Sequence, residues 1–318
     1  MTFYLFHQNM RSFGGGTTAY NNRMKKAFGE IPIGGADKTV LAAGFTEVKN
    51  SAMAPIALGG IAKRLDIGLT KTWTVVVGCT GTLVKDPDAP PAAKKAKTST
   101  TSKIYTREYI TMVTQYRPAE EFEVLHWGKA LFLDSITTGP SPAACFPAGG
   151  LNSPAATELP TNAKVDSRGL AYIVGRVRSV GDPLHNKLLV VCFMHNMYGV
   201  GDRSSGLTGV PSLVSTIYAA HAADIDPVRD PCIIGGDFNA EPRAVGRGGN
   251  HFEPQAETSP TGNYYRTTGS SVYDWWLCRA DSLDDAKPEI WMQTYKKNKP
   301  ILSDHAGISL GLDVGMWW

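Results

Sequence analysis

Short apolar runs, each ending in polar or acidic residues, recur along the whole chain. Runs rich in β-branched and aromatic residues favour strands. In the first half they predict strands at Thr2–Gln8, Thr39–Val48, Trp73–Cys79, Tyr109–Tyr116 and Ala130–Ser135. The polar segment Tyr20–Phe28 and the helically spaced apolar residues of Ile56–Leu65 predict helices between these strands.

The second half of the chain repeats this alternation with different residues. Two strand-like runs, 170–180 and 187–195, flank the turn sequence GDPLHN and predict an antiparallel hairpin. A helix is predicted at Pro211–Ala223, and further strands at PCIIGGDFN, SVYDWWLC and ISLGLDV. Two halves that each mix strands with helices are typical of a pair of packed sheets with helices outside.

Two segments lack apolar periodicity and predict loops. The segment 84–103 contains proline, alanine, threonine and five lysines, and we interpret it as a mobile basic loop. Its Lys94, Lys95 and Lys97 resemble a short nuclear-import patch, although a solvated insertion is the preferred interpretation. The segment Pro140–Asn162 is a second long loop. We interpret residues 1–318 as a single domain.

Composition limits the possible functions only in part. A hydrophobic content of 42% is enough for a sizeable core and excludes global disorder. Because 32 basic residues nearly balance 29 acidic ones, the net charge of +3 does not by itself indicate nucleic-acid binding. The five cysteines are an odd number without a CxxC pair, so they predict neither a zinc site nor a complete disulfide framework.

Targeting signals are not evident in the sequence. The N-terminal MTFYLFHQN lacks the features of a secretory leader, and no run of about 18 apolar residues predicts a membrane span. We therefore expect a soluble, cytoplasmic protein, with leaderless secretion and nuclear entry left open.

Acidic and amide residues stand repeatedly at the ends of the predicted strands. Any one of them alone is more typical of a strand-terminating turn. Together they would share one rim, where hard oxygen ligands suit Mg²⁺ or Mn²⁺ and a substrate phosphate. The set indicates a phosphoester site and comprises Asn9, Glu47, Asp237, Asn239, Asp274 and Asp304.

Two of these segments are the most specific. In GGDFNAEP, the glycines would allow a tight turn after a buried strand, so that Asp237 and Asn239 project toward one point. Asp237 could accept a proton or orient water, and Asn239 could donate to a phosphoryl oxygen. In SDHAGISL, Asp304 and His305 precede a strand and would point to opposite sides, toward metal and phosphate. As an imidazolium, His305 would stabilise the charge that develops there.

The ordered set of Asn9, the FTEV glutamate, the VCFMH histidine, GGDFN, YDWW and SDH resembles the endonuclease/exonuclease/phosphatase superfamily. Its members include deoxyribonuclease I, abasic-site endonucleases, inositol-polyphosphate phosphatases and bacterial sphingomyelinases. The resemblance covers nearly the whole chain. It implies a four-layered α/β sandwich, with two central mixed β-sheets packed face to face and helices outside. It also implies phosphoester hydrolysis with a divalent cation held by Glu47, Asp304 and Asn9. By the same resemblance, Asn9 and Asn239 bind phosphate, and Asp237 assists the attacking water or the leaving group.

The segment KIYTREYITM resembles deoxyribonuclease I in particular, where a tyrosine enters the minor groove and a glutamate supports a histidine. This implies that Tyr105 binds substrate and that two pairs, His195 with Glu108 and His305 with Asp274, flank the scissile phosphate. Which histidine is the base and which the acid is not readable. The strand RGLAYIVGRV and the following histidine loop also resemble cytolethal distending toxin subunits, which makes the arginines of this region candidates for DNA contact: Arg168, Arg176 and Arg178.

Three functions from different classes compete. The preferred one is a Mg²⁺-dependent endonuclease that hydrolyses DNA phosphodiester bonds. The alternative is a phosphatase or phospholipase of the same superfamily, acting on a phosphoinositide, sphingomyelin or a nucleotide. A non-catalytic binding module is disfavoured, because it has no need for a costly cluster of like charges.

Two further expectations concern structure: His7 is a core or rim histidine, and Trp275 and Trp276 face opposite sides of their strand.

Overall fold

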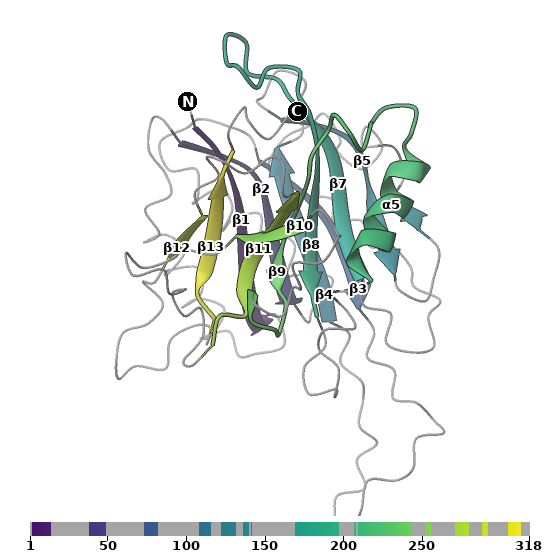
Figure 1. Cartoon of the computed structure of the whole chain (residues 1–318). Coiled ribbons are helices and arrows are strands. Elements are labelled where there is room, and N and C mark those ends of the chain that lie inside the picture. The colour runs from purple at the N-terminus through teal and green to yellow at the C-terminus, as the bar shows by residue number, and fades with distance from the viewer. Residues whose placement is uncertain are drawn as a thin grey trace, which may run out of the picture.

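The computed structural model describes residues 2–13, 38–48, 73–81, 108–115, 122–131, 136–139, 141, 169–196, 207, 209–242, 252–255, 271–279, 288–291 and 305–312. These ranges form two mixed β-sheets and one helix, α5 (Figure 1). The helices predicted at Tyr20–Phe28 and Ile56–Leu65 and the basic loop at 84–103 lie outside the described residues, as does the loop at 140–162 apart from residue 141.

The first sheet has six strands in the order β12-β13-β1-β2-β4-β3. Its members come from both ends of the chain: β1 (Thr2–Phe13), β2 (Lys38–Val48), β3 (Trp73–Gly81), β4 (Glu108–Gln115), β12 (Pro288–Trp291) and β13 (Gly307–Gly311). Only β1 and β2 run parallel, and every other neighbouring pair is antiparallel.

The second sheet is built from the middle of the chain, in the order β10-β11-β9-β8-β7-β5-β6. Its strands are β5 (Phe122–Leu131), β6 (Thr137–Thr138), β7 (Gly169–Val177), β8 (Leu188–His195), β9 (Cys232–Asp237), β10 (Phe252–Gln255) and β11 (Asp274–Arg279). Here β8 and β9 form the single parallel pair. Each sheet therefore contains one pair of neighbouring strands whose carboxyl ends lie side by side.

The two sheets pack face to face over an apolar core. The first sheet contributes Phe3, Leu5, Leu41 and Met112, and the second contributes Trp127, Phe193 and Trp276, all at most 1% exposed. Alternation along β1 puts residues 3 and 5 on this inner face, so residues 7 and 9 follow on the same face. The sandwich of two mixed sheets predicted from the sequence is confirmed.

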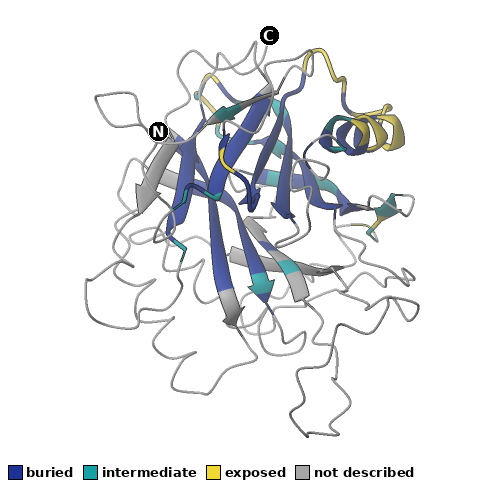
Figure 2. Ribbon diagram, turned by 60° about the horizontal axis from the view of Figure 1, so that its bottom comes forward, coloured by how far each residue is buried: buried dark blue, intermediate teal, exposed yellow. Residues whose placement is uncertain are grey.

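Helix α5 (Val210–Ala220) covers the outer face of the second sheet. Its buried side, including Leu213, Val214 and Ile217, packs on Tyr172, Val190 and neighbouring residues of β7, β8 and β9. Figure 2 shows the opposite side of the helix exposed to solvent. Among the described residues no helix is both long and apolar enough to cross a membrane.

Several strand assignments need correction. The strand predicted at Ala130–Ser135 begins earlier, at Phe122, because FEVLHWGKAL pairs with β7. The edge strands β10 and β12 were not predicted, since both are four residues long and contain proline. Trp275 and Trp276 do face opposite sides of β11, but both sides are buried, because the outer face lies under a second apolar cluster.

Candidate active site

Six strands of the two sheets contribute polar side chains to one rim of the sandwich, at the lower edge in Figure 1. The parallel strands bring their carboxyl ends to this rim, with Asn9 and Glu47 from the first sheet and His195 and Asp237 from the second. The antiparallel neighbours begin there, with Asp274 opening β11 and His305 preceding β13. Residues separated by almost 300 positions in sequence thus meet at one site.

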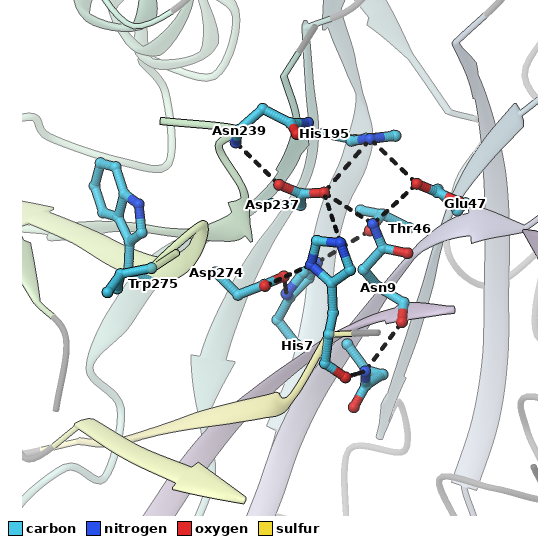
Figure 3. A network of polar contacts seen from close by, with 12 residues as sticks. His7, Asn9, Thr46, Glu47, His195, Asp237, Asn239, Asp274 and Trp275 are labelled. Carbon is cyan, nitrogen blue, oxygen red and sulfur yellow. Dashed lines mark hydrogen bonds and ion pairs between the residues drawn. The ribbon is translucent and has the colours of Figure 1, made fainter. Parts of the chain in front are cut away.

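Asn9 links the two sheets through its side-chain amide. Its Nδ2 donates to Glu47 Oε1 at 3.1 Å and to Asp237 Oδ2 at 2.8 Å (Figure 3). Asn9 and Glu47 belong to the first sheet, whereas Asp237 ends a strand of the second. The bond to Asp237 is buried, where a hydrogen bond is stronger than at the surface, whereas the bond to Glu47 is only partly buried.

Asp274 and His305 form a close pair. Nδ1 of His305 lies 2.6 Å from Asp274 Oδ2, and its Nε2 lies 3.8 Å from Asp237 Oδ2. Because an ionised carboxylate only accepts, His305 donates its Nδ1–H to Asp274. In the neutral imidazole this leaves Nε2 as an acceptor that faces the centre of the cluster. The pairing inferred from the sequence is therefore present in the structure as a geometric arrangement.

His195 faces two carboxylates. Its Nε2 lies 3.8 Å from Glu47 Oε1 and 3.7 Å from Asp237 Oδ2. The side chain of Glu47 is 25% exposed and that of His195 is 9% exposed, whereas Asp237 and Asp274 are at most 2% exposed. Glu47 is therefore the carboxylate of this cluster that is most accessible to solvent.

Glu47 has an uncommon backbone conformation. Its φ is 53°, in the left-handed region, and it lies between Phe45 and Val48, where the pairing of β2 with β4 shifts register. A non-glycine residue with positive φ is disfavoured and is frequent at functional sites. The bulge at this position directs the carboxylate toward Asn9 and His195.

The GGDFN segment is built differently from the expectation. Gly235 and Gly236 do not form a tight turn but are buried within β9. A Cβ at Gly235 would lie 2.4 Å from the Trp276 ring, and one at Gly236 would lie 2.3 Å from the Met194 carbonyl oxygen. The glycines are therefore required for close packing. The left-handed turn falls later, at Asn239, with a φ of 48°.

Aromatic packing and backbone contacts hold this turn from behind. The Phe238 ring stacks on Trp275 with centroids 3.9 Å apart, and Trp275 Nε1 donates to the Ala240 carbonyl at 2.9 Å. The Asn239 backbone N–H donates to Asp237 Oδ1 at 2.9 Å, which fixes the orientation of that carboxylate. Figure 3 shows Trp275 set apart from the polar network itself.

The donor set fits a hard divalent cation. Two groups of side chains, Glu47 with His195 and Asp237, and Asp237 with Asp274 and His305, each bring their ligand atoms within 4.8 Å of one another. Burial, and next the nearby charge of Asp274, raise the pKa of Asp237 to about 7. Two buried carboxylates side by side are costly without a compensating charge, and oxygen ligands at an open rim suit Mg²⁺ or Mn²⁺.

Not all residues singled out in the sequence are brought to this cluster. Arg176 pairs with Leu188 in the β7–β8 ladder, at the opposite end of β8 from His195. Both Arg176 and Arg178 form ion pairs with Glu123. We therefore leave these two arginines out of the proposed site. Glu108 begins β4, but its side chain is not described, and three further candidates lie outside the described residues: Tyr105, Arg168 and Asp304.

Three residues of the cluster were not identified from the sequence as functional. Asn196 Nδ2 donates to the Phe238 carbonyl and the Asn196 carbonyl accepts from Asn239 Nδ2, both at 2.9 Å, so Asn196 ties the ends of β8 and β9 together. His7 and Thr46 lie beneath the rim. Asn196 directly follows a predicted strand, so the strand-end pattern that selected Asn9 could have found it. Nothing in the pattern marks the other two.

The two packed mixed sheets have the fold of the endonuclease/exonuclease/phosphatase superfamily, the deoxyribonuclease I-like fold. A truncated TDP2 from Caenorhabditis elegans is similar over 98% of this chain and 97% of its own, with a TM-score of 0.55 and 14% identity. An endonuclease/exonuclease/phosphatase family protein from Bacteroides thetaiotaomicron matches over 98% and 97%, with a TM-score of 0.52 and 12% identity.

A TDP2 from D. rerio, complexed with a single-strand DNA product, matches over 98% of both chains with a TM-score of 0.50 and 11% identity. At these identities the comparisons establish a shared fold. No protein-family model and no curated protein sequence matches the chain.

Proposed function

We propose that the protein is a divalent-metal-dependent phosphodiesterase. The observation that carries this proposal is the convergence of Glu47, His195, Asp237, Asp274 and His305 at one rim, with ligand atoms within 4.8 Å in two overlapping groups. Such a set of buried and half-buried charges is costly to fold, and it is typical of a catalytic site rather than of a packing core.

The metal would be held by oxygen atoms at the accessible side of the cluster. Glu47 is the most exposed carboxylate of the set, and Asn9 and Asp237 lie within hydrogen-bond distance of one another beside it. By resemblance, Asp304 would add a further ligand. When bound, a divalent cation supplies positive charge to the phosphoryl oxygens and lowers the pKa of water.

His305 and Asp274 would act as a pair on the substrate. Asp274 accepts the Nδ1–H of His305 at 2.6 Å, which fixes the ring and its tautomer. The Nε2 then faces the reacting centre, where it can accept a proton from water or, when protonated, donate one to a leaving oxygen. His195 faces the same centre from β8. Asn239 gives one N–H to the Asn196 carbonyl and keeps the other as an amide donor to phosphate, whereas both N–H groups of Asn9 are given to Glu47 and Asp237.

DNA is the substrate we propose within this class. The support is the resemblance of KIYTREYITM to deoxyribonuclease I, with Tyr105, Glu108 and Arg168 in the corresponding roles, and the D. rerio TDP2 of the same fold with a single-strand DNA product. Contacts to the phosphate backbone would make such binding strongly dependent on salt. The alternative is hydrolysis of a phosphoinositide, sphingomyelin or a nucleotide at the same site.

The decisive experiment is cleavage of supercoiled plasmid in the presence of Mg²⁺. We expect nicking by the wild-type protein, loss of nicking with EDTA, and strong loss in His195→Ala and His305→Ala. His126→Ala is the matched control, because His126 lies on β5, away from the rim, and bonds Asp224. Nicking that persists in both rim variants would overturn the assignment. An intact plasmid with turnover of a phosphoinositide or a chromogenic phosphodiester would instead favour the alternative substrate class.

A further inference from the structure

A histidine lies in the apolar core directly beneath the rim. His7 is 0% exposed and follows Phe3 and Leu5 along the inner face of β1. Its ring stacks on Phe193 of the opposite sheet, with centroids 6.4 Å apart and an interplanar angle of 21°. Figure 3 shows it next to Asp274 and below Asn9. A polar ring in such a position is costly unless its nitrogen atoms are bonded.

The two ring nitrogens of His7 have different neighbours. Nε2 lies 3.4 Å from Thr46 Oγ1. Nδ1 lies 3.9 Å from Asp274 Oδ1 and has no hydrogen-bond partner among the described residues. The groups that face this ring from the packed elements are therefore Thr46 of β2, Asp274 of β11 and Phe193 of β8. His305, which pairs with Asp274, is a further titratable group whose charge acts on this ring.

The surroundings determine which nitrogen of His7 carries the hydrogen. The ring is 0% exposed and stacks on Phe193 in the apolar core, so it is neutral and carries a single N–H. If Nε2 carried it, the lone pair of Nδ1 would face a carboxylate oxygen, which is repulsive. With the hydrogen on Nδ1, Thr46 donates its hydroxyl to Nε2 and the ring N–H points at Asp274.

Asp274 needs such a donor. Its side chain is 0% exposed, and its Oδ2 is engaged by His305 at 2.6 Å. A carboxylate held at one oxygen can still rotate about its Cβ–Cγ bond, whereas donors at both oxygens fix its plane. A shift of about 1 Å would bring the His7 Nδ1 within hydrogen-bond distance of Asp274 Oδ1.

We propose that His7 is a positioning residue, whose Nδ1–H holds Oδ1 of Asp274 and thereby fixes the carboxylate that orients His305. The consequence for catalysis depends on the proposed function, whereas the contact itself does not. His7 touches neither substrate nor metal in this scheme. It acts through Asp274 on the orientation and tautomer of His305.

Three substitutions separate the roles of the two nitrogens. His7→Asn keeps an amide N–H donor near the position of Nδ1. His7→Gln places the amide donor near the position of Nε2 instead, and His7→Leu has no polar atom at either position. Leu5→Ala is the matched control, because Leu5 is also 0% exposed on the inner face of β1, two residues further from the rim. It disturbs the same core without removing a donor to Asp274.

The first measurement requires no substrate. The proton between His305 Nδ1 and Asp274 Oδ2 should give a low-field NMR signal in the wild-type protein. We expect this signal to persist in His7→Asn and Leu5→Ala, and to broaden or disappear through exchange with water in His7→Gln and His7→Leu. A sharp signal in His7→Leu would overturn the proposal, as would its equal loss in Leu5→Ala.

The second measurement is steady-state cleavage of plasmid. We expect His7→Gln and His7→Leu to lower kcat by about 10-fold to 100-fold with little change in KM, as for supporting residues of other sites. His7→Asn should restore kcat to within about threefold of wild type. A failure of the Asn variant to restore kcat would contradict the donor role. If the wild-type protein cleaves no DNA, the proposed function fails, while the NMR comparison still decides the contact.

Discussion

Glu47 and Asn239 have a left-handed backbone, with φ of 53° and 48°. Asparagine tolerates this region because its short side chain bonds locally, but glutamate does not share that advantage. The strain at Glu47 is therefore maintained by the fold around it and serves to aim the carboxylate. A substitution that relieves the strain at Glu47 should therefore raise the stability of the fold and lower the activity.

We predict that Glu47→Gly raises the free energy of unfolding by up to about 1 kcal/mol, because glycine adopts positive φ without strain. The same change should lower kcat by about 100-fold or more, since the proposed metal ligand is lost. Chemical denaturation and plasmid cleavage measure the two effects.

Asn186→Gly provides the control for this prediction. Asn186 also has a positive φ, 66°, but it lies in the β7–β8 connection, at the far end of the sheet from the rim. Its replacement should leave kcat unchanged. If Glu47→Gly proved less stable than wild type, strain at Glu47 would be the wrong explanation of its conformation.

At the residue scale, the sequence predicted those site members that stand at strand ends. Asn9, Glu47, Asp237 and Asp274 carry that signal, because a strand end also fixes where its side chain points. His195 was predicted from the resemblance of VCFMH to the superfamily. His7 carries no such signal, since a histidine inside an apolar run predicts only burial. The sequence also did not show why residues 235 and 236 must be glycines. The reason lies in the close approach of Trp276 and Met194 from neighbouring strands.

At the scale of elements, helix α5 is joined to the second sheet by a polar contact as well as by apolar packing. His221 follows the helix and its Nε2 lies 2.9 Å from the Tyr172 hydroxyl of β7. The ring also stacks on His126 of β5, with centroids 4.3 Å apart. Burial, and next the charge of His126, lower the pKa of His221 to about 4, although Asp224 acts in the opposite direction.

This geometry predicts a loss of stability in acid. The folded pKa of His221 lies below the unfolded value of 6.5, so its neutral form stabilises the fold above about pH 6.5. That contribution is lost as the pH falls toward 4, where the ring gains a proton that it binds more readily when unfolded. His221→Gln keeps an acceptor for Tyr172 without titrating, and its melting temperature should fall less between pH 7 and pH 4. Equal slopes for variant and wild type would refute this account.

The two sheets approach one another closely at Gly44 of β2. A Cβ there would lie 2.1 Å from the ring of Phe193 on β8, and this ring also supports His7. We predict that Gly44→Ala lowers the free energy of unfolding by about 1–3 kcal/mol through overpacking. Adding Phe193→Leu should recover part of this loss in denaturant unfolding. If the double variant were as unstable as the sum of the two single ones, the clash would not be the cause.

Long apolar elements were predictable and short edge elements were not. The runs that form β2, β3, β4, β8 and β9 have continuous β-branched or apolar residues, which is typical of strands buried on both faces. The edge strands β10 and β12 contain proline and few apolar residues, and only pairing with β11 and β13 makes them strands. Such pairing depends on tertiary structure, which a local pattern does not contain.

At the scale of the whole molecule, the site binds the two sheets to one another, since Asn9 of the first sheet bonds Asp237 of the second. A cation held by groups from both sheets should therefore stabilise the complete sandwich. At a free Mn²⁺ or Mg²⁺ concentration 100 times the dissociation constant, we predict a gain of about 2.7 kcal/mol in the free energy of unfolding.

Thermal unfolding with and without EDTA tests this prediction, together with calorimetric titration of the metal. Glu47→Gln, which keeps the shape of the side chain but removes its charge, should abolish most of the gain. Stabilisation of equal size in this variant would show that the ion binds elsewhere.

The pairing of β1 with β13 has a consequence for the newly made protein. Ribosomes release a chain from its N-terminal end, so β1 and its companions emerge long before β13 and the adjacent His305. Until then one edge of β1 is unpaired and Asp274 has no imidazole to orient. With the proposed activity, the protein would in this way remain inert during its translation until His305 and β13 have been made.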